Sequence, residues 1–178
     1  MHITEEQKSN ALQYARENQV EYGLSCSESV LNALIRAGIV DLPEYYTCLA
    51  TGLSGGVGAS GNTCGAVYGA MMALGAVYGR KNPLAHPFEP TKKIPLEEDY
   101  RYYMMRRFNN LINDYVNHFE TCRCREFVDK CGGYFEKERV DFCPDLIVYA
   151  TELAIKYLEM DEQTNNALPY QHNIYGWK

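Results

Sequence analysis

An uncharged run over residues 64–79 most constrains how this chain can fold. The run consists largely of Ala, Gly, Val and Met, and its 16 residues fall short of the roughly 20 that a helix needs to cross a bilayer. Gly65 and Gly69 lie four positions apart, as do Gly75 and Gly79, a spacing that lets another backbone approach one face of a helix closely. The run is therefore predicted to be a buried, tightly packed helix.

The rest of the chain also has helical patterning, with no alternating strand pattern. Thr4 with Gln7 and Ser25 with Glu28 match the capping box that opens a helix. Pro144 is predicted to stand in the first turn of the last helix, where its missing N–H costs nothing. Apolar spacing and these signals predict helices at about 4–20, 25–37, 41–49, 64–78, 96–119 and 144–160.

These predictions give an all-α fold: a single-domain helical bundle of about five to seven helices. The domain is expected over residues 1–160, with a glycine-rich loop before the small-residue helix and a polar C-terminal tail over residues 161–178.

Charge and composition exclude several classes of protein. The formal net charge is -6, from 17 basic and 23 acidic residues, which argues against binding nucleic acid. The first eight residues are polar and contain no apolar signal core, so we expect a cytoplasmic protein without membrane insertion.

Seven cysteines are many for a chain expected in a reducing compartment. Cys26, Cys64 and Cys143 are each predicted to stand at a helix start, where free N–H groups and the helix dipole favour thiolate over thiol. Metal binding and redox chemistry are therefore the expected functions. The alternative is that the cysteines are inert, since free cysteine is among the most buried residue types.

A glycine-rich connection over residues 52–61 precedes the small-residue helix. It contains a GxGxxG match, but no βαβ pattern that a dinucleotide site requires. Anion binding at the start of the following helix stays open, because backbone N–H groups there are unpaired. The candidate cofactor-binding residues are Gly56, Gly58 and Gly65.

Four spaced elements resemble the C-GCAxxG-C-C family of redox-active proteins, over about residues 7–160. Residues 22–31, around Cys26, look like the first element, and residues 55–58 with 64–70, around Cys64, look like the second. Cys124 with residues 125–127 is similar to the third, with Cys122 as its alternative, and Cys143 with Pro144 is similar to the fourth. Cys48, Cys122 and Cys131 depart from the family pattern, as does a tyrosine-rich insertion around residues 81–105.

The resemblance implies a redox role in which the four matching cysteines converge: Cys26, Cys64, Cys124 and Cys143. They are the candidate catalytic residues and the candidate metal ligands. Four thiolates suit a [2Fe–2S] cluster for electron transfer or, less well, a structural zinc. The first alternative is cofactor-free thiol–disulfide exchange with Cys64 as the attacking thiol. The second is a non-enzymatic binding or scaffold module.

Partners are expected from two observations. The resemblance implies a redox partner of unknown identity and a link to a membrane transporter system. The aromatic content, with 15 Tyr and 6 Phe and a terminal Trp177, favours a homodimer, because aromatic residues commonly anchor interfaces.

Overall fold

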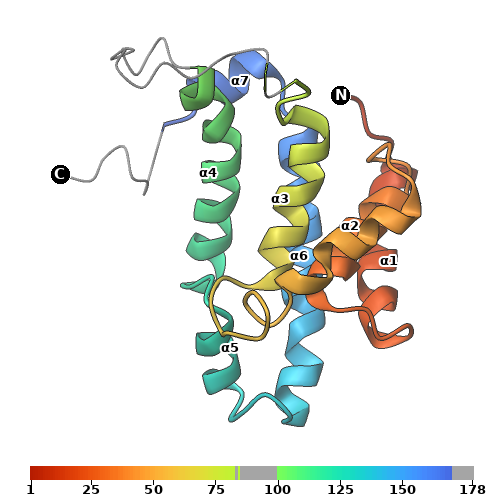
Figure 1. The fold of residues 1–178 in the computed structure, drawn as a ribbon, viewed down its shortest axis with the longest axis vertical. Coiled ribbons are helices and arrows are strands. Elements are labelled where there is room, and N and C mark those ends of the chain that lie inside the picture. The colour runs from red at the N-terminus through yellow and green to blue at the C-terminus, as the bar shows by residue number, and fades with distance from the viewer. Residues whose placement is uncertain (83, 85–99, 170–178) are drawn as a thin grey trace, which may run out of the picture.

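The computed structural model describes residues 1–82, 84 and 100–169, and these residues form an all-α domain (Figure 1). The all-α, single-domain prediction is confirmed. The helix count lies slightly above the expected range, because the described residues form seven α-helices and one 3-10 helix. The elements are α1 (Glu5–Val20), α2 (Cys26–Arg36), η1 (Glu44–Leu53), α3 (Gly65–Tyr78), α4 (Tyr100–Phe119), α5 (Cys124–Lys130), α6 (Lys137–Glu159) and α7 (Glu162–Ala167).

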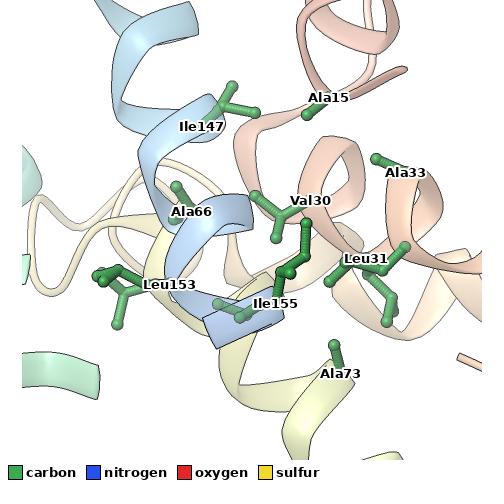
Figure 2. Close-up of a cluster of buried hydrophobic side chains, with 14 of the residues drawn as sticks. Ala15, Val30, Leu31, Ala33, Ala66, Ala73, Ile147, Leu153 and Ile155 are labelled. Atoms are coloured by element: carbon green, nitrogen blue, oxygen red, sulfur yellow. The ribbon is translucent and has the colours of Figure 1, made fainter. Parts of the chain in front are cut away.

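The core lies where α1, α2, α3 and α6 meet. Figure 2 shows small side chains such as Ala15 of α1 and Ala66 of α3 beside larger ones such as Val30 of α2 and Ile147 of α6. All four of these residues are almost completely buried. Alanine on facing helices brings the backbones close together, and the branched side chains fill the remaining space.

Helix α3 packs most closely on α2, and two glycines allow this approach. A Cβ at Gly69 would lie 2.5 Å from the carbonyl oxygen of Ser27 and 2.8 Å from Cβ of Val30. A Cβ at Gly65 would lie 2.4 Å from Sγ of Cys26. The close packing predicted for residues 64–79 is thus present at the amino-terminal end of α3.

The second glycine pair of α3 does not behave as predicted. Among the described residues, no atom outside the surrounding turns of α3 lies within 4 Å of a Cβ placed at Gly75, and the three atoms nearest to a Cβ at Gly79 belong to Gly75. The carboxy-terminal end of α3 contacts α6 and α4 through Tyr78 instead, whose hydroxyl donates to the carbonyl of Leu158 and whose ring lies against Arg107.

The two predicted capping boxes are present at Thr4 and Ser25. The predicted start of the last helix is wrong, since α6 begins at Lys137 and Pro144 lies inside it. Pro144 therefore has no N–H to donate to the carbonyl of Val140, a cost that the burial of the following apolar residues offsets.

The carboxy-terminal region contains a short helix that the sequence analysis did not predict. Helix α7 lies in the expected polar tail and packs against α4. Trp177 and most of the tyrosine-rich insertion lie outside the described residues. Within the described residues, no helix is long and apolar enough to cross a membrane.

Candidate functional site

Four cysteines from four parts of the fold line one cavity of about 590 Å³. Cys26 is the first residue of α2, Cys64 directly precedes α3, Cys124 is the first residue of α5, and Cys143 lies in the second turn of α6. All four are free thiols. These elements are far apart in sequence, so tertiary packing alone brings the sulfurs to one cavity.

A short backbone pairing fixes Cys64 relative to Cys124. Thr63 and Arg123 form an isolated antiparallel bridge. Around it, the N–H of Cys64 donates to the carbonyl of Cys122 at 2.7 Å, and the N–H of Cys124 donates to the carbonyl of Asn62 at 2.7 Å. Because backbone hydrogen bonds hold both segments, the two cysteines keep their relative position without help from their side chains.

The glycine-rich connection before this bridge has an unusual backbone. Five consecutive residues, 55–59, have positive φ, and two of them, Val57 and Ala59, are not glycine. Such a conformation costs roughly 1–2 kcal/mol for each residue with a Cβ. The fold accepts this strain at the segment that places Ser54 and Gly55 in the cavity wall.

At two of the candidate cofactor-binding glycines, close packing leaves no room for a side chain. A Cβ at Gly56 would lie 2.4 Å from the backbone nitrogen of Asn62. Gly65 makes room for the sulfur of Cys26. Gly58 faces open space, and its cofactor-binding role, like that of the other two, stays a prediction.

Cys64 is the most deeply buried of the four cavity cysteines, with 4% of its surface exposed. Burial raises the pKa of its thiol strongly, and the nearby Cys26 raises it further. The hydroxyl of Tyr115 donates a hydrogen bond to Sγ of Cys64 at 3.7 Å, and this bond lowers the pKa of Cys64. A helix start was expected to favour the thiolate at this residue, but removal from water outweighs the dipole.

Cys26 is the common neighbour of the other three cysteines. It is half-buried, and its negative charge would raise the pKa of Cys64, Cys124 and Cys143. Burial is nevertheless the largest cause at each of these thiols, and it raises the pKa of Cys124 to about 11.

Cys143 has a cation within reach. Arg139 lies one helical turn earlier in α6, and its Nη1 donates to Sγ of Cys143 at 3.9 Å. Burial raises the pKa of Cys143, whereas the charge and hydrogen bond of Arg139 lower it. The expected position of Cys143 at a helix start is wrong, and Arg139 instead supplies the positive charge that a helix start would have offered.

The other three cysteines do not line this cavity. Cys48 is exposed on η1, while Cys122 and Cys131 are half-buried. Cys131 is near enough to Cys143 for its charge to raise the pKa of that thiol. Cys124, rather than Cys122, is thus the third cysteine in the cavity wall.

The donor set has the chemistry for iron–sulfur or zinc binding, but its present spacing does not fit a metal site. Among the residues that the structure describes, no three His, Cys, Asp or Glu side chains lie close enough together to hold a metal ion. The [2Fe–2S] cluster and zinc therefore remain predictions from the resemblance.

Sequence reasoning missed two residues of this site. Tyr115 is part of an apolar helical stripe in the sequence, although a buried tyrosine hydroxyl ordinarily needs a hydrogen-bond partner. Arg139 lies in a segment that was expected to precede the last helix. Its position four residues before Cys143 becomes meaningful only once that segment is helical.

The comparison with protein families agrees with this arrangement. Residues 24–157 match the family described as "Putative redox-active protein (C_GCAxxG_C_C)", a match over more than half of the chain. No curated protein and no solved structure matched the chain. The chain belongs to the C_GCAxxG_C_C family.

Proposed function

We propose that this protein is a thiol–disulfide redox protein in which Cys26 and Cys64 form the working pair. The main support for this proposal is that Sγ of Cys26 lies directly against Gly65, the residue that follows Cys64. Among neighbouring charges, that of Cys26 has the largest effect on the pKa of Cys64. Both residues line one cavity, whose volume of about 590 Å³ is in the range of small-molecule sites.

We infer the order in which the two thiols react from the difference in their burial. Cys26 is half-buried, while Cys64 is buried and has a strongly raised pKa. Thiolate is the attacking form, and it must reach its target. Cys26 therefore attacks first and Cys64 second, which reverses the role expected for Cys64 from the sequence.

The reaction transfers two electrons without a cofactor. The Cys26 thiolate attacks one sulfur of a disulfide RSSR, the S–S bond breaks, and the leaving thiolate takes a proton as RSH. Cys64 then loses its proton and attacks Sγ of Cys26, forming an internal disulfide and releasing the second RSH. The two protein thiols are oxidised, and the substrate disulfide is reduced to two thiols.

The test uses the fully reduced protein with bis(2-hydroxyethyl) disulfide, followed by intact-mass analysis. The unchanged protein should lose two hydrogens and carry no adduct. Cys64→Ser should keep a mercaptoethanol adduct on Cys26, because no second thiol resolves it. Cys26→Ser should slow the formation of an internal disulfide at least about tenfold, whereas Cys48→Ser, changed at an exposed cysteine outside the cavity, should react like the unchanged protein.

Equal reaction of Cys26→Ser and the unchanged protein would overturn the proposed pair, and no internal disulfide in either protein would favour the scaffold alternative. Iron and acid-labile sulfide in anaerobically purified protein would favour electron transfer through a cluster instead. Cytoplasmic location, a transporter partner and a homodimer stay predictions; sedimentation across a range of concentrations tests the homodimer.

A further inference from the structure

Arg139 lies in the wall of the cysteine cavity and has unused capacity for hydrogen bonding. Its guanidinium carbon lies 4.4 Å from the centre of the Tyr134 ring, which supports one face of the group. Its Nε is buried and has no hydrogen-bond partner among the described residues. Nη1 reaches only a sulfur, Sγ of Cys143, at 3.9 Å.

The charge of Arg139 also has no carboxylate partner within the part of the chain that the structure describes. The cavity wall contains one other arginine, Arg16, and one carboxylate, Asp141. Arg16 pairs with Asp145 at 2.6 Å, and Asp141 pairs with Lys137. Among the described residues, no carboxylate pairs with Arg139, although a half-buried cation ordinarily has such a partner.

We propose that Arg139 makes this cavity a binding site for anionic disulfides, in particular those with a carboxylate near the S–S bond. The inference rests on the proposed thiol–disulfide function and names its substrate class. A planar guanidinium in a cavity wall is suited to a carboxylate. Arg139 lies one turn from Cys143, so a carboxylate held there places the attached disulfide among the cavity thiols.

A matched pair of substrates tests the charge preference. Dithiodiglycolate has two carboxylates, whereas bis(2-hydroxyethyl) disulfide is neutral and of similar size. The measured quantity is the ratio of the two oxidation rates of the reduced protein, divided by the same ratio for free 2-mercaptoethanol, which removes the intrinsic difference between the substrates. We expect the protein to favour dithiodiglycolate by about tenfold, as one charge-assisted hydrogen bond provides.

Three variants test whether Arg139 causes the preference for dithiodiglycolate. Arg139→Gln should lower the ratio about tenfold, to that of the free thiol. Arg139→Lys should retain part of the preference, because the charge stays but the forked geometry is lost. Arg16→Gln should retain the full preference, because Asp145 already compensates the charge of Arg16.

A ligand without a reducible bond separates this inference from the redox proposal. Adipate has the shape of dithiodiglycolate with two methylene groups in place of the two sulfurs. Titration calorimetry should detect adipate binding that Arg139→Gln weakens about tenfold. Equal binding of adipate and inorganic sulfate would identify a general anion site and overturn the specificity for carboxylates.

The outcomes are distinguishable. Adipate binding that depends on Arg139, in a protein that reduces neither disulfide, would support the anion site while the redox proposal falls. Reduction of both disulfides at the free-thiol ratio, without adipate binding, would overturn the anion site and leave the redox proposal standing. The ratio for the unchanged protein decides the question even if a variant fails to fold.

Discussion

At the amino-terminal end of α3, Gly65 and Gly69 lie against α2, whereas at Gly75, near the other end, no described atom outside the surrounding turns of α3 lies within 4 Å of the point that a Cβ would occupy. Both ends have glycines at the same four-residue spacing. Only the end that carries Cys64 has the close contact, and only that end borders the cysteine cavity. Small residues thus permit close packing, while the neighbouring helix decides where it occurs.

Among the changes that test this difference, substitution of Gly69 should have the largest effect on stability. Gly69→Leu must displace the backbone of Ser27 and the side chain of Val30, and we expect a loss of at least about 3 kcal/mol in the free energy of unfolding. Gly69→Ala should cost about 1–3 kcal/mol for the same reason. Urea denaturation measures both values.

Gly75→Ala is the matched control, in the same helix and with open space around it. It should stabilise the protein by about 0.5–1 kcal/mol, because alanine favours a helix more than glycine does. A similar loss of stability in Gly69→Ala and Gly75→Ala would contradict the difference between the two ends.

Gly65 packs against the sulfur of Cys26, and a double-mutant cycle measures the energetic coupling between these two residues. Gly65→Ala should cost about 1 kcal/mol, less than Gly69→Ala, because the atom it meets first is the movable sulfur of Cys26. In a Cys26→Ala background the cost should largely disappear, giving a coupling of about 1 kcal/mol. Additive costs in the cycle would show that Cys26 does not occupy the space beside Gly65.

The smallest expected effect concerns Tyr115, which contacts the same end of α3 through Cys64. Tyr115→Phe removes the hydrogen bond that stabilises the thiolate, so the pKa of Cys64 should rise and its alkylation at fixed pH should slow about threefold. Tyr149→Phe is the control, because Tyr149 shares the aromatic cluster but no hydrogen bond joins it to Cys64. Faster alkylation in Tyr115→Phe would contradict this role.

The pH dependence follows from the same shift. Because the pKa of Cys64 is raised, its thiolate fraction and alkylation rate should rise about tenfold per pH unit and show no plateau at an ordinary cysteine pKa of about 8.5. Peptide mass spectrometry gives the rate for each cysteine. A plateau below about pH 9 would show an ordinary thiol instead.

Local signals in the sequence predict much of this fold. The capping boxes at Thr4 and Ser25 depend on a few neighbouring residues, and the structure has both at the predicted place. Pro144 misled the prediction of the last helix, because its local preference for a first turn was overridden by the tertiary packing of α6.

The environments of the site residues are harder to predict from local signals in the sequence. The four cysteines could be named from the resemblance, but their environments depend on distant contacts. The bridge between Thr63 and Arg123 joins segments far apart in the chain, and the raised pKa of Cys64 comes from burial that no local pattern records. That no carboxylate of the described residues pairs with Arg139 likewise depends on the tertiary arrangement and not on a local pattern.

The pairing of Cys26 with Cys64 is the central claim, and disulfide mapping tests it most directly. The fully reduced protein is treated with one equivalent of bis(2-hydroxyethyl) disulfide, remaining thiols are blocked at low pH, and the peptides are identified by mass spectrometry. The account predicts one main disulfide, between Cys26 and Cys64, with Cys48, Cys122 and Cys131 recovered as blocked thiols. A main disulfide that leaves Cys64 as a thiol would contradict it.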